Sequence, residues 1–327
     1  MTGRPLLELD RLSAHYVTSR GTRVVRAVDE VSLSLRAGET LGVVGESGSG
    51  KTTLALTILR LLPPAARIVS GALRFDGEDL LAKSPAEMRH IRGKRIAMIL
   101  QDPMASLNPL FTVGDQVGEG VRVHEHVTRR SARERAGALL RAVKIPAAAQ
   151  RMGEYPHQMS GGMRQRIVGA IAIACGPQLL IADEPTTSLD VTIQAQYLKL
   201  LRDIQREHGL ALIFITHNLG IVARMCDSVA VMYAGRVIES GKVRQIFNAP
   251  AHPYTRALIE SIPRLGGGPG RLTAIDGQPP DLAVLPPGCS FQVRCPRVMD
   301  RCRVQEPPAL DVGVGADHTA RCWLVKS

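Results

Sequence analysis

The sequence predicts an α/β protein with a mainly parallel sheet, because short apolar runs alternate with helix-like stretches along most of the chain. The strand-like runs cover residues 40–44, 95–100, 179–183, 211–216 and 228–233. Continuous apolar runs of this length are typical of parallel strands that are buried on both faces. Their alternation with helices favours an α/β fold over an all-β or all-helical one.

Two regions depart from this alternation. Residues 6–36 alternate apolar and polar side chains around turn signals, which predicts antiparallel strands with one buried face. From about residue 103 to 175 the pattern is helical. The sequence therefore predicts an antiparallel β subdomain and a helical subdomain beside the α/β core.

Composition restricts the class of protein and its location. The chain has 327 residues, of which 45% are hydrophobic, which suits one large globular domain with a small appendage. No uninterrupted apolar stretch approaches the ~20 residues that span a bilayer. Residues 1–5 lack the apolar core of a signal peptide. We therefore expect a cytoplasmic protein that reaches any membrane through partners.

The chain is basic, with 41 Lys and Arg against 30 Asp and Glu and a net charge of +11. Nucleic acid or an anionic membrane surface would each suit such a charge. The basic residues are scattered, however, apart from a run at 129–135 that we interpret as a solvated helix start. Aromatic residues make up only 3% of the chain, which argues against a stacking platform for single strands.

The most specific motif is a phosphate-binding loop of the pattern G-x-x-x-x-G-K-S/T between a predicted strand and a predicted helix. Its residues are Gly45, Glu46, Ser47, Gly48, Ser49, Gly50, Lys51 and Thr52, with Thr53 following in the helix. The glycines allow successive backbone N–H groups to point at one anion near the helix N-terminus. Lys51 is expected to reach the β- and γ-phosphates of ATP, and Thr52 to ligate Mg²⁺.

Two carboxylates follow the buried run 179–183. Asp183 and Glu184 stand where a parallel strand presents ligands, at its carboxyl end. Asp183 suits the Mg²⁺ shell, and Glu184 is placed to orient or deprotonate the attacking water. Together with the phosphate loop, this pair predicts hydrolysis of a nucleoside triphosphate.

A second anion site precedes the helix-like run that begins after Gly162. Ser160, Gly161 and Gly162, followed by Met163, offer free N–H groups without obstructing side chains. One chain holding one nucleotide has no evident use for a second such site.

At this point the sequence strongly resembles the nucleotide-binding subunits of ABC transporters, whose signature loop completes the ATP site of a facing subunit. Further family positions occur in order, namely Tyr16, Gln101, Ser188-Leu189-Asp190 and His217. The resemblance implies a P-loop NTPase of ABC type over residues 1–262. The helical region at about 103–175 then corresponds to the subdomain that carries the signature.

The resemblance also implies roles for these residues. Tyr16 stacks on adenine, Gln101 senses Mg²⁺ and the transmembrane partner, and His217 hydrogen-bonds the γ-phosphate. Asp190 crosses the dimer interface. Met163 replaces the family's commoner Gln, which leaves the anion-binding backbone unchanged. The turn Asn108-Pro109 is expected to lie near the surface that receives the coupling helix of a membrane partner, the alternative being an ordinary interdomain loop.

Three stretches, at 45–52, 183–196 and 252–255, resemble the ATPase subunits of oligopeptide and dipeptide importers. Met163 and the tail resemble the D-like member of a heteromeric pair. The implied partners are a second ATPase, two membrane permease subunits and an extracellular binding protein, with this chain on the cytoplasmic face of the membrane. Alternatives are an importer of nickel or another small solute and a soluble ABC ATPase acting on nucleic acid. A purely regulatory nucleotide-binding module is disfavoured by Glu184.

The C-terminal region is expected to be a linker and a separate small module over residues 263–327, away from every ATP motif. It follows the glycine-rich stretch 266–270 and contains Cys289, Cys295, Cys302 and Cys322. Clustered cysteines in a cytosolic chain point to metal, and a module of this size needs a staple. The loop-wide spacing favours a 4Fe–4S cluster over Zn²⁺, and unmetallated thiols are the remaining alternative. The resembled family also has four cysteines here that can bind such a cluster.

Overall fold

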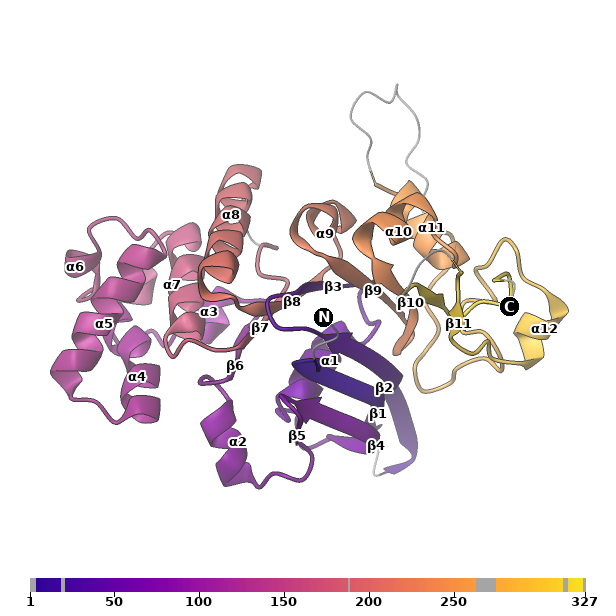
Figure 1. Ribbon diagram of the computed structural model, residues 1–327, viewed down its shortest axis with the longest axis horizontal. Helices are drawn as coiled ribbons and strands as arrows, with labels where there is room; N and C mark the ends of the chain where they lie inside the picture. Colours follow the sequence, from indigo (N-terminus) through magenta and orange to yellow (C-terminus); the bar gives the residue numbers. More distant parts are fainter. Residues whose placement is uncertain (1–3, 19–20, 188, 263–274, 314–316, 326–327) are drawn as a thin grey trace. The chain divides into compact units, whose positions relative to one another are not determined.

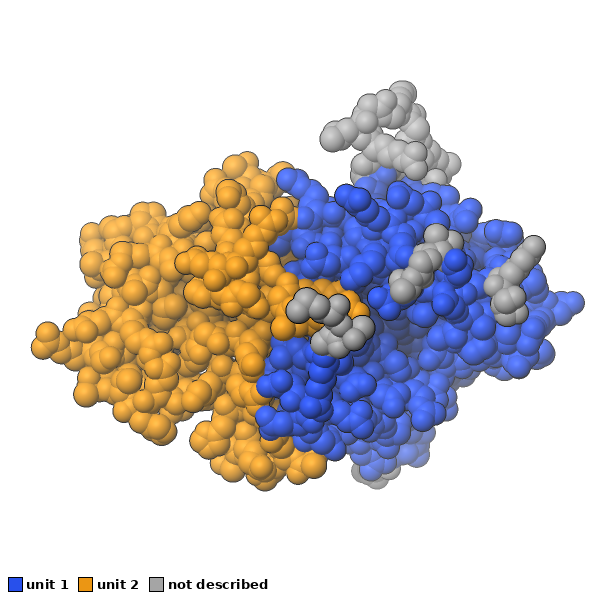
Figure 2. Space-filling view, viewed as in Figure 1, with its two compact units in different colours: residues 1–35, 40–81, 216–327 blue, residues 36–39, 82–215 orange. Residues whose placement is uncertain are grey.

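The computed structural model describes residues 4–18, 21–187, 189–262, 275–313 and 317–325. The chain forms two compact units, coloured separately in Figure 2. Unit 1 comprises residues 1–35, 40–81 and 216–327, and unit 2 comprises residues 36–39 and 82–215.

Unit 1 contains an antiparallel sheet with the strand order β2-β1-β4-β5 (Figure 1). Its strands are β1 (Leu7–Thr18), β2 (Arg23–Leu35), β4 (Ala66–Phe75) and β5 (Glu78–Asp79). Leu7, Leu9, Leu12 and Ala14 of β1 are buried, whereas Glu8, Asp10 and Arg11 are not. The alternation seen in the sequence is therefore that of strands with one buried face.

The second set of strands in unit 1 carries the phosphate loop. In order across the sheet these are β11 (Leu310–Asp311), β12 (Thr319–Ala320), β10 (Arg236–Lys242), β9 (Ser228–Tyr233) and β3 (Thr40–Val44). β3 and β9 are parallel and pair Val44 with Val231. The helices of this unit are α1 (Lys51–Ile58), α9 (Leu219–Met225), α10 (Val243–Asn248), α11 (Pro253–Glu260) and α12 (Asp300–Val304).

Unit 2 contains the parallel strands β8 (Ala211–Thr216), β7 (Leu179–Asp183) and β6 (Ile96–Ile99), in that spatial order. All five residues of β7 are buried. Burial of each Leu or Ile contributes about 1.5–3 kcal/mol relative to exposure. This buried strand therefore fixes the position of Asp183, its last residue, and of Glu184, which follows it.

The remainder of unit 2 is helical. Its helices are α2 (Pro85–Ile91), α3 (Pro103–Ser106), α4 (Val113–Glu125), α5 (Arg129–Ala142), α6 (Ala148–Arg151), α7 (Gly161–Ile173) and α8 (Val191–His208), with a short 3₁₀ turn at Pro156–Gln158. The basic run at 129–135 opens α5 and is capped by Thr128, whose hydroxyl accepts from the N–H of Ser131.

The tail does not form a compact unit of its own but belongs to unit 1, together with the phosphate loop. Phe291 is 1% exposed and packs in T-shaped contacts against Tyr233 of β9 and Tyr254 of α11. β12 pairs with β10, so the tail also extends the sheet of unit 1. A segment with too few apolar residues for its own core is stabilised by packing on a larger one. The predicted boundary and the glycines at 266–270 fall within residues 263–274, outside the described part of the chain.

No helix among the described residues is both long and apolar enough to cross a membrane.

Candidate functional site

The phosphate loop joins the end of β3 to the start of α1 within unit 1. Gly45, Gly48 and Gly50 all have positive φ, of 154°, 79° and 99°. A Cβ atom at Gly50 would overlap the backbone carbonyl of Ala27, and one at Gly45 would overlap that of Met232. Glycine is therefore required at both positions for two reasons, its backbone conformation and the close approach of another strand.

Lys51 lies within this loop. Its Nζ donates to the carbonyl oxygens of Gly45 and Glu46, each at 2.8 Å, and to Ser49 Oγ at 3.3 Å. Lys51 and Ser49 are buried, whereas Ser47, Gly48 and Thr52 are exposed. The loop thus has a rigid inner side around the ammonium group and an accessible outer side.

Tyr16 of β1 lies beside the first turn of α1. Its hydroxyl is 3.4 Å from Thr53 Oγ1, which is a long hydrogen bond between partly buried groups. The structure therefore brings together Tyr16, Thr53 and the phosphate loop, as one nucleotide site within unit 1 would require.

Sequence reasoning missed a further residue at this loop, Arg294 of the tail. Its guanidinium forms two hydrogen bonds with the Glu46 carboxylate, at 2.7 and 2.9 Å. These bonds raise the pKa of Arg294 above its ordinary value. A signal was available, because a carboxylate inside an anion-binding loop needs a nearby cation. The finding also corrects the expectation that the tail lies away from the ATP motifs.

In unit 2 the two carboxylates at the end of β7 have different surroundings. Asp183 is 1% exposed. Glu184 has the left-handed backbone φ of 44°, and its N–H donates to the carbonyl of Ile215 at 2.9 Å. A non-glycine residue held in this region is strained, and such strain concentrates at functional sites.

The side chain of Glu184 is oriented by two neighbours. Thr187 Oγ1 donates to Glu184 Oε2 at 2.9 Å, and Gln101 Nε2 donates to the same oxygen at 3.4 Å. The structure therefore brings Gln101 and Glu184, 83 positions apart in sequence, to one place.

Ser160, at the signature loop, is the N-cap of α7. Its hydroxyl accepts from the N–H of Met163 at 3.3 Å. Gly161 is exposed, and a Cβ there would meet no other atom within 4 Å. Gly162 is more restricted, because a Cβ would lie 2.8 Å from Ile193 Cγ2. The first turn of α7 thus presents backbone N–H groups at an accessible surface.

Asp190 and His217 occupy separate loops. The Asp190 carboxylate caps α8 by accepting from the N–H groups of Thr192 and Ile193, at 3.1 and 2.9 Å. Asp190 remains exposed. His217 is exposed between β8 and α9 in unit 1. Ser188 lies outside the described residues.

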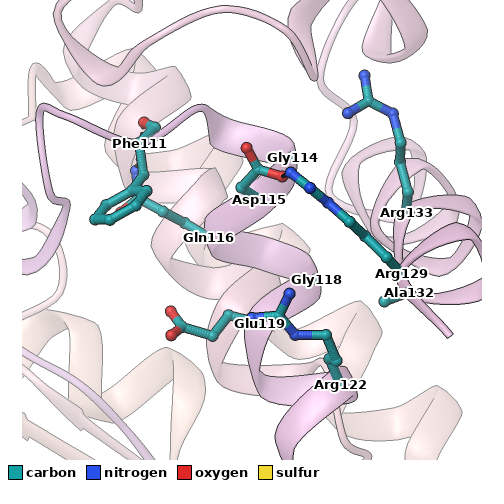
Figure 3. Close-up of a pocket in the computed structure, with 10 residues that line it drawn as sticks. All are labelled: Phe111, Gly114, Asp115, Gln116, Gly118, Glu119, Arg122, Arg129, Ala132 and Arg133. Carbon is teal, nitrogen blue, oxygen red and sulfur yellow. Dashed lines mark hydrogen bonds and ion pairs between the residues drawn. The ribbon is translucent and has the colours of Figure 1, made fainter. Parts of the chain in front are cut away.

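A pocket of about 240 Å³ opens between α4 and α5 of unit 2, beside Phe111 (Figure 3). Its charged residues are Asp115, Glu119, Arg122, Arg129 and Arg133. Arg129 forms an ion pair with Asp115 at 3.6 Å, and Figure 3 shows the two side chains pointing toward one another.

Phe111 lines this pocket, and Leu110 precedes it in the sequence. Leu110 is 80% exposed and Phe111 is 55% exposed. The preceding turn at Asn108 is held by Gln116, whose Nε2 donates to the carbonyls of Asn108 and Phe111. The exposed side chains therefore project from a fixed turn.

The four cysteines of the tail, Cys289, Cys295, Cys302 and Cys322, line a single small cavity. All four are free thiols. Burial raises the pKa of Cys289 to about 11 and raises those of Cys295 and Cys322 above their ordinary value.

The predicted metal site is not confirmed. Among the described residues, no three Cys, His, Asp or Glu side chains are arranged to hold a metal ion. The chain topology gathers the thiols around one cavity, but it does not place them at ligating distances from one centre.

Comparison with known proteins identifies the family. The ABC transporter family matches residues 28–187, and the family described as oligopeptide/dipeptide transporter, C-terminal region, matches residues 238–302. The chain is 49% identical to the dipeptide transport ATP-binding protein DppD of Bacillus subtilis, over 98% of this chain and 94% of that protein. It is 47% identical to the protein of the same name from Escherichia coli, over 92% of each.

Among solved structures, the chain resembles the ATP-binding cassette MJ0796 in a dimeric post-hydrolysis state with ADP and Pi. The two chains are 25% identical with a TM-score of 0.65, over 73% of this chain and 99% of that one. The α/β P-loop fold is thus shared with a protein of known architecture. The chain belongs to the ABC transporter ATP-binding proteins of the oligopeptide/dipeptide branch.

Proposed function

We propose that this protein is the ATP-hydrolysing subunit that powers import of dipeptides or oligopeptides through a membrane ABC transporter. The observation that carries the proposal is the near-complete match to two proteins named for dipeptide transport. The names of these relatives favour peptides over nickel or another small solute as the transported substrate. Membership of a transporter family argues against an ATPase that acts on nucleic acid.

ATP binding is assigned to the phosphate loop with its neighbours. Gly45, Ser47, Gly48, Ser49 and Gly50 form the backbone cradle, as the positive φ angles of the three glycines support. Lys51 contacts the β- and γ-phosphates, Tyr16 stacks on the adenine, and Thr53 flanks it. Mg²⁺ takes Thr52, Gln101 and Asp183 as its protein ligands.

Hydrolysis is assigned to Glu184, with Gln101 and His217. The hydrogen bonds from Thr187 and Gln101 orient the Glu184 carboxylate. Glu184 positions the attacking water and His217 hydrogen-bonds the γ-phosphate, because phosphoryl transfer needs positioning and charge neutralisation more than covalent chemistry.

A second ATPase subunit completes the mechanism. Ser160, Gly161, Gly162 and Met163 close on the ATP of the partner, and Asp190 lies at the dimer interface. The exposure of Ser160 and Gly161 at the start of α7 supports this assignment. The dimeric state of the similar cassette MJ0796 is consistent with it.

We assign the pocket beside Phe111 as the contact site for a membrane permease subunit. A short helix of a permease subunit would place apolar side chains against Leu110 and Phe111 and polar ones against the charged wall of α4 and α5. Two permease subunits and an extracellular binding protein complete the transporter, with this chain at the cytoplasmic face of the membrane.

For the tail we propose that Cys289, Cys295, Cys302 and Cys322 hold a 4Fe–4S cluster, with Zn²⁺ as the alternative; binding would require the thiols to move closer together than they lie in this structure. The gathering of four thiols from a 34-residue stretch around one cavity supports the proposal. The cluster would act as a structural cross-link of the tail.

The substitution Glu184→Gln tests the ATPase assignment. In the assembled transporter it should retain ATP binding and lower the rate of steady-state hydrolysis at least ~100-fold, since the group that positions water is lost. Glu207→Gln, at an exposed position of α8, serves as the control and should hydrolyse ATP normally. Turnover of the Glu184→Gln transporter within twofold of wild type would refute the assignment.

A further inference from the structure

The phosphate loop contains a charge that opposes its task. Glu46 stands directly after Gly45, in a loop whose N–H groups and lysine attract a triphosphate. A carboxylate in a loop that cradles phosphates repels them, and partial exclusion of water makes the repulsion stronger than in bulk solvent. Binding ATP at this loop therefore requires that the charge of Glu46 be neutralised.

Arg294 supplies the neutralising charge from the tail. Its Nη1 donates to Glu46 Oε2 at 2.7 Å and its Nη2 donates to Oε1 at 2.9 Å, which is the two-bond geometry specific to arginine. The Arg294 side chain is only 3% exposed, whereas that of Glu46 is 27% exposed. The guanidinium is thus buried against the loop, whereas the carboxylate keeps contact with solvent.

The guanidinium is itself fixed in place. Its Nε donates to the carbonyl of Asp276 at 2.9 Å, and Nη2 also donates to that of Ile275 at 3.3 Å. Nη1 also donates to the hydroxyl of Tyr233 at 3.4 Å. With the two bonds to Glu46, all five N–H donors of Arg294 have partners. Such a side chain holds its partner in one position.

Glu46 transmits this position to the phosphate-binding lysine. The N–H of Glu46 donates to the Tyr254 hydroxyl at 2.9 Å, and its carbonyl accepts from Lys51 Nζ at 2.8 Å. Arg294 therefore fixes the side chain of Glu46, and Tyr254 fixes its backbone N–H. Together they position the Glu46 carbonyl that contacts Lys51. The aromatic ring of Phe291, from the same tail segment, packs against Tyr254.

We propose that Arg294 is a positioning residue for ATP, which cancels the charge of Glu46 and sets the carbonyl that contacts Lys51. The tail is then part of the nucleotide-binding machinery. This inference rests on the proposed function in one respect, that the phosphate loop binds ATP.

The test is ATP affinity of the full-length chain with Mg²⁺, measured by calorimetric titration at low and high salt. Arg294→Gln should weaken ATP binding about tenfold at low salt, because the Glu46 carboxylate is left unpaired beside the phosphates, and the defect should shrink at high salt. In the assembled transporter the same change should raise KM for ATP and leave kcat within twofold.

Two further variants separate neutralisation from mere structural support. Glu46→Gln should bind ATP at least as tightly as wild type, because the repulsive charge is gone. The double variant Glu46→Gln with Arg294→Gln should recover most of the affinity that Arg294→Gln loses. Arg23→Gln is the matched control, since it breaks another ion pair between the tail and the body, Arg23 with Asp281, which is about half exposed.

Affinity of Arg294→Gln within twofold of wild type would overturn the inference. So would a double variant as weak as Arg294→Gln, or a Glu46→Gln chain that binds ATP tenfold more weakly. Wild-type protein that fails to bind ATP at all would instead contradict the proposed function.

Discussion

Gly50 of the phosphate loop has a backbone conformation and a close neighbour that together exclude any other residue. Gly50 has φ of 99°, and a Cβ there would overlap the carbonyl of Ala27. Gly21 also has positive φ, at 94°, but a Cβ there meets no atom within 4 Å. Replacing Gly21 therefore tests the cost of backbone strain alone, whereas replacing Gly50 tests strain together with a steric clash.

Gly50→Ala should displace the start of α1 and lower ATP affinity more than ~10-fold, because moving the loop by even 1 Å disrupts its fit to the phosphates. Gly21→Ala should cost only about 1–2 kcal/mol of strain and leave ATP affinity unchanged. Nucleotide titration and thermal unfolding of both variants measure the two effects. Equal ATP affinity in the two variants would contradict the assigned role of Gly50.

At this scale the sequence picked out candidate residues that stand in motifs, but not the distant side chains that contact them. Lys51 and Glu184 stand in motifs with fixed spacing, so the sequence alone was enough to select them as candidates. Arg294 is one of many arginines and carries no motif. Its role depends on a contact with Glu46, 248 positions away, which no local pattern encodes.

Among the elements, the buried parallel strands were predictable, whereas the antiparallel strand β10 was not. The runs 40–44, 179–183, 211–216 and 228–233 match β3, β7, β8 and β9. Continuous burial makes such strands uniformly apolar. β10 is instead interrupted by Glu239, which is 1% exposed. Its carboxylate is satisfied by His318 and by the N–H groups of Ala251 and His252.

The tail shows the limit of reasoning from composition. Richness in proline and cysteine suggested a separate module, yet His318 and Phe291 anchor it to β10 and to the aromatic residues of unit 1. A polar residue such as Glu239 becomes a favourable buried group only when a distant partner meets it. The partner of Glu239 is His318, which lies 79 positions away and so outside any local sequence pattern.

The tail also carries the metal prediction. Anaerobically purified protein should be brown, with about four irons and four sulfides per chain, and Cys302→Ser should abolish the colour. Cys175→Ser, outside the tail, is the control and should keep it. Because Arg294 precedes Cys295 directly, loss of the cluster should also weaken ATP binding.

Metal analysis of the same preparations distinguishes the alternatives. A colourless anaerobic protein with one zinc per chain would reject iron and retain the metal cross-link. A folded tail without any metal would reject both.

Over the whole molecule, the residues assigned to ATP are divided between the two units. Lys51 and His217 belong to unit 1, whereas Gln101, Asp183 and Glu184 belong to unit 2. The signature at Ser160 serves a facing subunit in the proposed mechanism. In that mechanism ATP hydrolysis requires the assembled transporter, and we expect the isolated chain to hydrolyse ATP poorly.

The most direct measurement of the central claim is peptide uptake. Proteoliposomes would contain this chain, the second ATPase and the membrane subunits that copurify with it, with the binding protein and labelled dipeptide on the opposite side from ATP. We predict that the dipeptide accumulates only with ATP and that Glu184→Gln abolishes accumulation. Hydrolysis of ATP without accumulation of any dipeptide or oligopeptide, or undiminished uptake with Glu184→Gln, would contradict the account.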